Sequence, residues 1–207
     1  MPKKEVPVLY LSRYLPSGAE ALVMHYLEHY RVHLTISKKR QTLLGDYRHP
    51  TPGRSHRISV NGNLNPYAFL ITLLHELAHL ITFEQFGPRV AAHGAQWKNC
   101  YSKLLTELLS QVALPSDLQT ALQQSLKNPA ASSCAEESLM RVLKRFDAPQ
   151  AGSCLLEQLQ LGESFKIADG RVFVKGEKLR KRYKCREQHS GALYLFSPIY
   201  EVERLAG

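Results

Sequence analysis

The longest helical pattern of the chain lies within its first half. Apolar residues recur at helical spacing from Phe69 to Ile81 and predict a helix there. Asn65 can cap the first turn of this helix, and Pro66 suits its first position. Gly87-Pro88 would end it. Because most of its positions are apolar, we expect this core helix to be largely buried.

Shorter patterns precede and follow the core helix. An amphipathic helix is predicted over residues 17–31, with Ser17 as its cap and Glu20 completing a capping box. Three strand-like runs come next, at residues 32–37, 42–47 and 56–61. Further helical patterns lie at residues 97–108, 118–126 and 136–146. This order of helices around a small three-stranded sheet predicts an α+β fold.

The C-terminal quarter of the chain has a different character. Turn signals such as Asp169-Gly170 separate short strand-like runs, which predict a small β-meander or compact barrel. These runs lie at residues 164–168, 172–175, 178–186 and 192–196. The clearest linker by composition is Asn128–Ser133. We therefore expect a first domain over residues 1–128, a helical linker over 129–153 and a small, basic β-rich domain over 154–207.

The composition adds a possible partner and a compartment. A formal net charge of +9 favours a polyanionic partner such as DNA, although a basic protein without such a partner would have the same charge. The basic run Lys38–Arg40 could touch phosphates or form a solvated turn. Four scattered cysteines without a C-x-x-C pair indicate reduced thiols. With no apolar run near the length of a membrane span and no signal peptide, we expect a cytoplasmic protein without a membrane partner.

The core helix carries the candidate chemistry. His75 and His79 stand four residues apart, so their imidazoles share one helix face and could bind one metal ion. Glu76, between them in an H-E-x-x-H pattern, suits a general base acting on a metal-bound water. The alternative is a pair of core histidines hydrogen-bonded to backbone carbonyls. Two histidines and a glutamate in an apolar helix are costly unless something pairs with them, which favours the metal site.

A catalytic zinc ion usually takes a third protein ligand. Glu107 is a distant candidate. His93 is the better one, because it follows the break at Gly87-Pro88 and precedes a new helical run, where a rigid element can hold it. The alternative for His93 alone is a loop or capping histidine.

Together, His75-Glu76-Leu77-Ala78-His79 and His93-Gly94-Ala95-Gln96-Trp97 resemble the SprT-like family of zinc metallopeptidases. This family includes the Spartan-type proteases, which digest proteins crosslinked to DNA. The resemblance covers about residues 15–110 and implies a zincin-like minimal metalloprotease domain with protein substrates. It also implies one Zn²⁺ per chain, held by His75, His79 and His93, with Glu76 as the catalytic glutamate.

The C-terminal domain departs from part of this family. Many members carry a zinc ribbon with paired cysteines, whereas here only Cys185 stands near the expected place, so we expect no second, structural zinc. The domain instead has a run of basic residues beside a tyrosine, which could follow phosphates and stack on a base. The nucleic-acid-binding candidates are Lys178, Arg180, Lys181, Arg182, Tyr183, Lys184 and Arg186. Alternatively, the aromatic residues form the core and the basic residues its solvated face.

Two functions are compatible with the sequence. The first is a zinc-dependent endopeptidase that acts on DNA-associated or DNA-crosslinked proteins, with Glu76 as general base. The second is a non-proteolytic nucleic-acid-binding protein with a structural zinc helix. The presence of Glu76 favours the enzyme, because a purely structural site does not need it.

Overall fold

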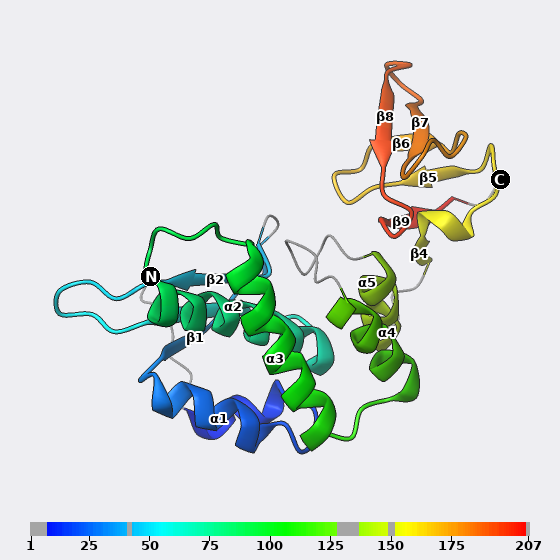
Figure 1. The fold of residues 1–207 in the computed structure, drawn as a ribbon. Helices are drawn as coiled ribbons and strands as arrows, with labels where there is room; N and C mark the ends of the chain where they lie inside the picture. The colour runs from blue at the N-terminus through cyan, green and yellow to red at the C-terminus, as the bar shows by residue number, and fades with distance from the viewer. Residues whose placement is uncertain (1–7, 41–42, 128–136, 149–151, 206–207) are drawn as a thin grey trace. The chain divides into compact units, whose positions relative to one another are not determined.

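The chain divides into two compact units, Met1–Asp147 and Ala148–Gly207, each with its own hydrophobic core. The computed structural model describes residues 8–40, 43–127, 137–148 and 152–205 (Figure 1). The predicted linker Asn128–Ser133 lies outside these residues. The α+β prediction is confirmed: the first unit combines helices with a three-stranded sheet, and the second unit contains a separate six-stranded sheet.

The first unit places a small sheet beside its longest helix. Its elements are η1 (Val8–Arg13), α1 (Glu20–His29), β1 (His33–Ser37), β2 (Gly45–Arg48), β3 (Arg57–Asn61), α2 (Pro66–Phe86), α3 (Ala95–Gln111), α4 (Ser116–Lys127), α5 (Glu137–Leu143) and η2 (Lys144–Phe146). The strand order is β1-β3-β2, with β3 parallel to β1 and antiparallel to β2. Strand β2 therefore lies at one edge of the sheet.

Helix α2 is the core helix that the sequence predicted. The Asn65 side chain caps it by accepting a hydrogen bond of 2.9 Å from the backbone N–H of Ala68, and Pro66 opens its first turn. Gly87, with a φ of 73°, ends it. By length and composition α2 could cross a membrane, contrary to our expectation from the sequence. The structure buries most of it inside the first unit, as expected for the core helix of a globular domain.

Helix α1 begins later than predicted. Its N-cap is Ala19 rather than Ser17, and no side chain caps it. Gly18 adopts a φ of 87° and turns the chain directly after Ser17, which places Ser17 outside the helix. The carboxylate of Glu20 instead accepts a hydrogen bond of 3.0 Å from the Gly18 N–H.

Helix α5 and the short η2 belong to the first unit, although they lie within the range that we expected to be a linker. Leu139 and Leu143 of α5 are buried in the first core. The side-chain amide of Asn65 donates to the Leu143 carbonyl (2.9 Å) and to the Asp147 carboxylate (2.6 Å). The residue that caps α2 thus also attaches the last helical segment of this unit.

The second unit is a small antiparallel sheet. Its elements are β4 (Ser153–Leu155), η3 (Leu156–Gln158), β5 (Ser164–Lys166), β6 (Val172–Val174), β7 (Tyr183–Glu187), β8 (Leu193–Phe196) and β9 (Glu201–Arg204). The strand order is β4-β9-β5-β6-β7-β8. The sequence did not predict β4 and β9. The strand predicted over 178–186 begins only at Tyr183, because the N–H of Leu179 bonds the Arg182 carbonyl (2.8 Å) and closes a turn.

Candidate metal centre

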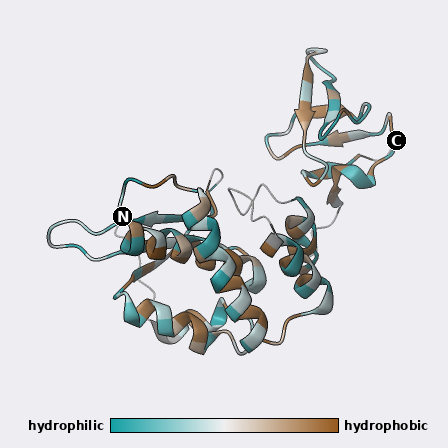
Figure 2. Cartoon of the chain, in the orientation of Figure 1, coloured by the Kyte–Doolittle hydropathy of each residue, from teal (hydrophilic) through white to brown (hydrophobic). Residues whose placement is uncertain are grey.

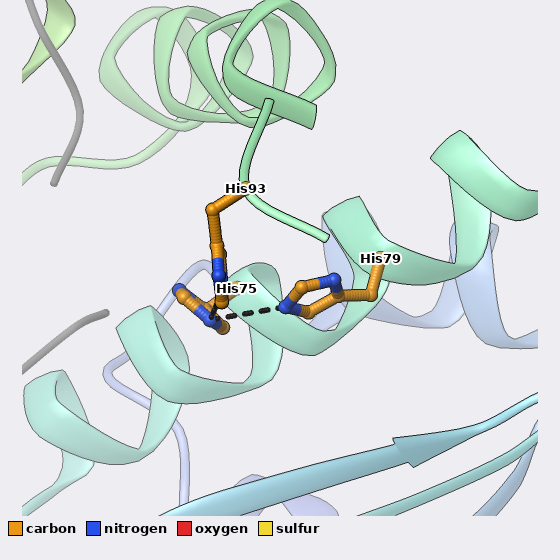
Figure 3. Close-up of side chains that lie close together, drawn as sticks. All are labelled: His75, His79 and His93. Atoms are coloured by element: carbon orange, nitrogen blue, oxygen red, sulfur yellow. Dashed lines mark hydrogen bonds between the residues drawn. The ribbon is translucent and has the colours of Figure 1, made fainter. Parts of the chain in front are cut away.

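Three histidine side chains converge at the start of α3. His75 and His79 come from one face of α2, and His93 comes from the loop that precedes α3 (Figure 3). The Nε2 atom of His75 lies 3.3 Å from the Nε2 atoms of both His79 and His93. Two ligands at about 2.0–2.1 Å from a tetrahedral zinc ion are about 3.3–3.4 Å apart. The spacing of these nitrogen atoms therefore fits a zinc ion.

The three imidazoles are neutral at pH 7. Burial, with smaller effects from His79 and His93, lowers the pKa of His75 to about 3. Burial and the neighbouring His93 lower the pKa of His79 to about 4. Burial also lowers the pKa of His93. Since a histidine must lose its proton to bind a metal, all three side chains are ready to act as ligands.

A buried aromatic wall supports the histidines. The Trp97 ring, which is fully buried, lies 4.7 Å from the His75 ring, 5.3 Å from His79 and 4.8 Å from His93, measured between centroids. Tyr101 stacks behind Trp97 at 5.0 Å. The Nδ1 atom of His75 and the Nε1 atom of Trp97 are buried without a hydrogen-bond partner in the described part of the chain. Packing rather than hydrogen bonding thus orients the His75 ring.

Glu76 lies on the side of α2 that faces the sheet. It is 7% exposed, and burial together with Asp46 raises its pKa to about 8, against the opposing effects of Arg40 and the backbone N–H of Tyr47. A Cβ atom on Gly45 would lie 2.6 Å from Oε1 of Glu76, so only glycine leaves room for this carboxylate. Strand β2 therefore forms one wall around Glu76.

Arg40 is only partly exposed, whereas one interpretation of the basic run placed it in a solvated turn. Its guanidinium donates to the Asn61 side chain (2.8 Å), the Ser59 hydroxyl (3.0 Å) and the Leu44 carbonyl (3.4 Å). Through these bonds Arg40 links Leu44, the residue before β2, to strand β3. Lys38 and Lys39 are exposed. Arg40 therefore holds the edge strand beside Glu76.

The structure brings His93, and not Glu107, to the two histidines of α2. One carboxylate oxygen of Glu107 accepts a hydrogen bond of 2.5 Å from the Tyr26 hydroxyl, which joins α3 to α1. Among the described residues, the three histidines form the group whose ligand atoms could hold a metal ion, all within 4.8 Å of one another. Glu107 therefore helps to pack α1 against α3.

The nucleic-acid-binding candidates lie in the second unit. The six basic candidates are all exposed, and the Tyr183 ring is half-buried between Lys175 and Lys178, whose Nζ atoms are 4.1 Å and 5.7 Å from its centroid. Phe173 and Phe196 are buried in the core, as the alternative interpretation expected. Lys175 is also buried, and its ammonium group donates to the carbonyls of Leu159 and Glu157.

Sequence reasoning missed several residues around the site. Gly45 could have been identified from the sequence, because a glycine inside a strand pattern often marks a close approach of another group. Asp46 and Tyr47, which act on the Glu76 carboxylate, gave no such signal. Tyr101 was assigned only to the apolar face of its helix, whereas its ring lies 5.7 Å from that of His75.

The comparison with protein families gives an independent result. The SprT-like family matches residues 16–115, which include α1, the three-stranded sheet, α2 and α3. Comparisons with curated proteins and with solved structures gave no match. The family is metallopeptidase-like and typically zinc-dependent, in agreement with the donor set of three neutral imidazoles. Residues 16–115, just under half of the chain, therefore match the SprT-like family.

Proposed function

We propose that the chain is a zinc-dependent endopeptidase with Glu76 as its general base. The observation that carries this proposal is the convergence of three histidines: the Nε2 atom of His75 lies 3.3 Å from those of His79 and His93. A buried glutamate, Glu76, lies on the same helix as His75 and His79. His75, His79 and His93 would hold one zinc ion per chain. A purely structural site would have no use for Glu76.

The chemistry divides between the metal and Glu76. A zinc ion bound by the histidines would polarise the scissile carbonyl and lower the pKa of water. Glu76 accepts a proton from the attacking water on a carboxylate oxygen and later donates it to the leaving amine. Burial raises the pKa of Glu76, which favours uptake of a proton by its carboxylate, and a zinc ion bound by the histidines would favour the ionised form that acts as the base. The Tyr47 N–H and the wall formed by Gly45 keep the carboxylate in one orientation.

Substrate would bind along β2. This strand lies at the edge of the sheet, and its first residue, Gly45, contacts Glu76. An extended peptide can add to such an edge through backbone hydrogen bonds, and this pairing depends little on the identity of the peptide's side chains. Unfolded or flexible protein segments are therefore the substrates that this site favours.

We further propose that these substrates are associated with DNA. The net charge of +9 and six exposed basic residues between Lys178 and Arg186 support this step.

Charge reversal of Arg180, Lys181 and Arg182 to glutamate should weaken DNA binding and reduce its salt dependence, by about 0.9 in slope per lost duplex phosphate contact. Cleavage of a DNA-free substrate should persist. If the affinity for DNA and its salt dependence are both unchanged, DNA binds elsewhere on the chain. Lys38 and Lys39 are then the next candidates.

The test of the proposed function compares Glu76→Gln with Glu84→Gln. Both changes remove one carboxylate from α2, but Glu84 pairs with His56 (3.1 Å) away from the histidine cluster. Glu76→Gln should retain zinc and lose casein cleavage by about 10²–10⁴-fold, while Glu84→Gln should cleave normally. If Glu76→Gln cleaves like the wild type, Glu76 is not the base. If wild type binds zinc and DNA but cleaves nothing, the non-proteolytic function holds.

A further inference from the structure

Strand β8 is an exposed edge of the six-stranded sheet. It pairs only with β7 among the described strands and ends the strand order (Figure 1). Its residues are Leu193, Tyr194, Leu195 and Phe196, and the strand is largely coloured as hydrophobic in Figure 2. Natural edge strands usually carry charges, prolines or bulges that prevent further pairing. This strand contains no charge and no proline.

The backbone of β8 is oriented for a further strand. The N–H of Glu187 bonds the Ala192 carbonyl, and in an antiparallel ladder hydrogen-bonded pairs alternate with non-bonded ones. Leu193 and Leu195 stand opposite Arg186 and Lys184 in non-bonded pairs, so their N–H and C=O groups point away from β7. The N–H of Lys184 confirms this alternation, since it bonds Glu177 on the other side of β7.

The side chains next to this edge are apolar and cationic. Leu193 and Leu195 are each 53% exposed and share the outer face with their cross-strand partners Arg186 and Lys184, which are exposed. Residues 178–186 contain six basic residues and no acidic one, and no ion pair joins these six to another described residue. At the β8 edge, the cations of Lys184 and Arg186 therefore have no ion-pair partner among the described residues, and no strand covers the two leucines.

We infer that β8 binds an extended segment of a partner protein in which apolar and acidic residues alternate. The segment would add as a seventh strand, through hydrogen bonds to the outward N–H and C=O groups of Leu193 and Leu195. Its apolar side chains would cover these leucines, and its acidic side chains would reach the cations of Lys184 and Arg186.

The chemistry of this edge favours such a segment over other occupants. A nucleic acid has no use for a free strand edge, and the outer face offers leucines where base stacking needs aromatic rings. A second copy of the chain would bring more cations instead of the missing anions. The inference does not depend on the proposed protease activity, because it uses only residues of the second unit. It shares Lys184 and Arg186 with the proposed DNA-binding residues, so DNA and the segment would compete for these two cations.

The test uses the full chain and a short labelled peptide of alternating valine and glutamate, with fluorescence polarisation as the readout. Leu195→Pro removes one outward N–H without breaking a bond to β7, so it should weaken binding about tenfold or more. The matched control is Leu161→Pro, in the same unit. Leu161 is 67% exposed and precedes Gly162, whose φ of 86° indicates a turn that accepts proline. This control should bind like the wild type.

Two further probes make the result independent of any variant. A peptide of alternating valine and lysine should bind at least about tenfold more weakly, and so should the acidic peptide when its amides are N-methylated on the pairing side. Equal binding of either probe would overturn the inference. A dimer that Leu195→Pro disrupts would also overturn the inference, because a second copy of the chain would then occupy β8. The same holds if the acidic peptide does not bind and Leu195→Pro weakens binding of a DNA oligonucleotide.

Discussion

A methyl group added at Gly45 should disable the proposed catalytic site without unfolding the first unit. A Cβ atom there would lie 2.6 Å from Oε1 and 2.8 Å from Cγ of Glu76, and 2.8 Å from Cγ2 of Thr72. Non-bonded heavy atoms prefer about 3.5–4.0 Å, so the overlap is about 1 Å. Glu76 is 7% and Thr72 2% exposed, so neither side chain can move freely into solvent. Gly45 has no positive φ, and the cost of alanine is therefore steric.

Two magnitudes follow from this overlap. Overfilling a packed site costs about 1–3 kcal/mol of unfolding free energy, which lowers the melting temperature by about 2–4 °C per kcal/mol in a unit of this size. Displacing a catalytic group by about 1 Å costs about 10²-fold in rate. We therefore expect Gly45→Ala to lose about 10²-fold in kcat/KM for casein, with its zinc content unchanged.

The matched control is Gly62→Ala. A Cβ atom at Gly62 would lie 2.6 Å from Cγ2 of Ile36, a comparable overlap that does not involve Glu76. Gly62→Ala should show a similar loss of melting temperature but nearly normal kcat/KM below its transition. The reasoning is refuted if Gly45→Ala cleaves casein as fast as the wild type, or if both variants lose activity equally.

Three other predictions concern the metal site and its supporting helix. His93→Ala should abolish stoichiometric zinc binding in metal analysis, because two histidines remain, whereas Glu107→Ala should retain it; full zinc occupancy in His93→Ala would move the third ligand elsewhere. Asn65→Ala should cost about 1–2 kcal/mol in urea unfolding through loss of the α2 cap, and an unchanged midpoint would contradict this role. In the metal-free protein, the folded pKa of His75 is about 3, well below its ordinary value, so the unfolded state takes up more protons as the pH falls. His75 should thereby lower the unfolding free energy by about 2 kcal/mol between about pH 7.5 and about pH 5, a pH dependence that His75→Ala should reduce.

The parts of the fold that follow from local spacing were predictable from the sequence. Helix α2, its Asn65 cap and its end at Gly87 all depend on residues within a few positions of one another. The i, i+4 spacing of His75 and His79 likewise fixes their common face. In the same way, the glycine and proline after α2 indicated that the chain could turn back towards these two histidines.

Contacts between distant residues were harder to predict. Strands β4 and β9 are only three and four residues long and depend on pairing with each other, so they show no clear alternation. Lys175 lies close in sequence to the exposed basic residues, but the carbonyls of Leu159 and Glu157 hold its ammonium group inside the second unit. A solvated turn was one of two interpretations of Lys38–Arg40. The sequence could not exclude it for Arg40, because the acceptors of this guanidinium come from segments that sequence alone does not bring together.

The aromatic wall behind the histidines gives the protein a built-in optical reporter. Trp97 is the single tryptophan of the chain, and its ring lies within 5.3 Å of all three imidazole rings, measured between centroids. Indole emission responds to the charge and rigidity of its immediate surroundings. Protonation of the histidines, or binding of a metal ion by them, should therefore change the fluorescence of Trp97. Occupancy of the site can thus be followed in the unlabelled protein, separately from any measurement of cleavage.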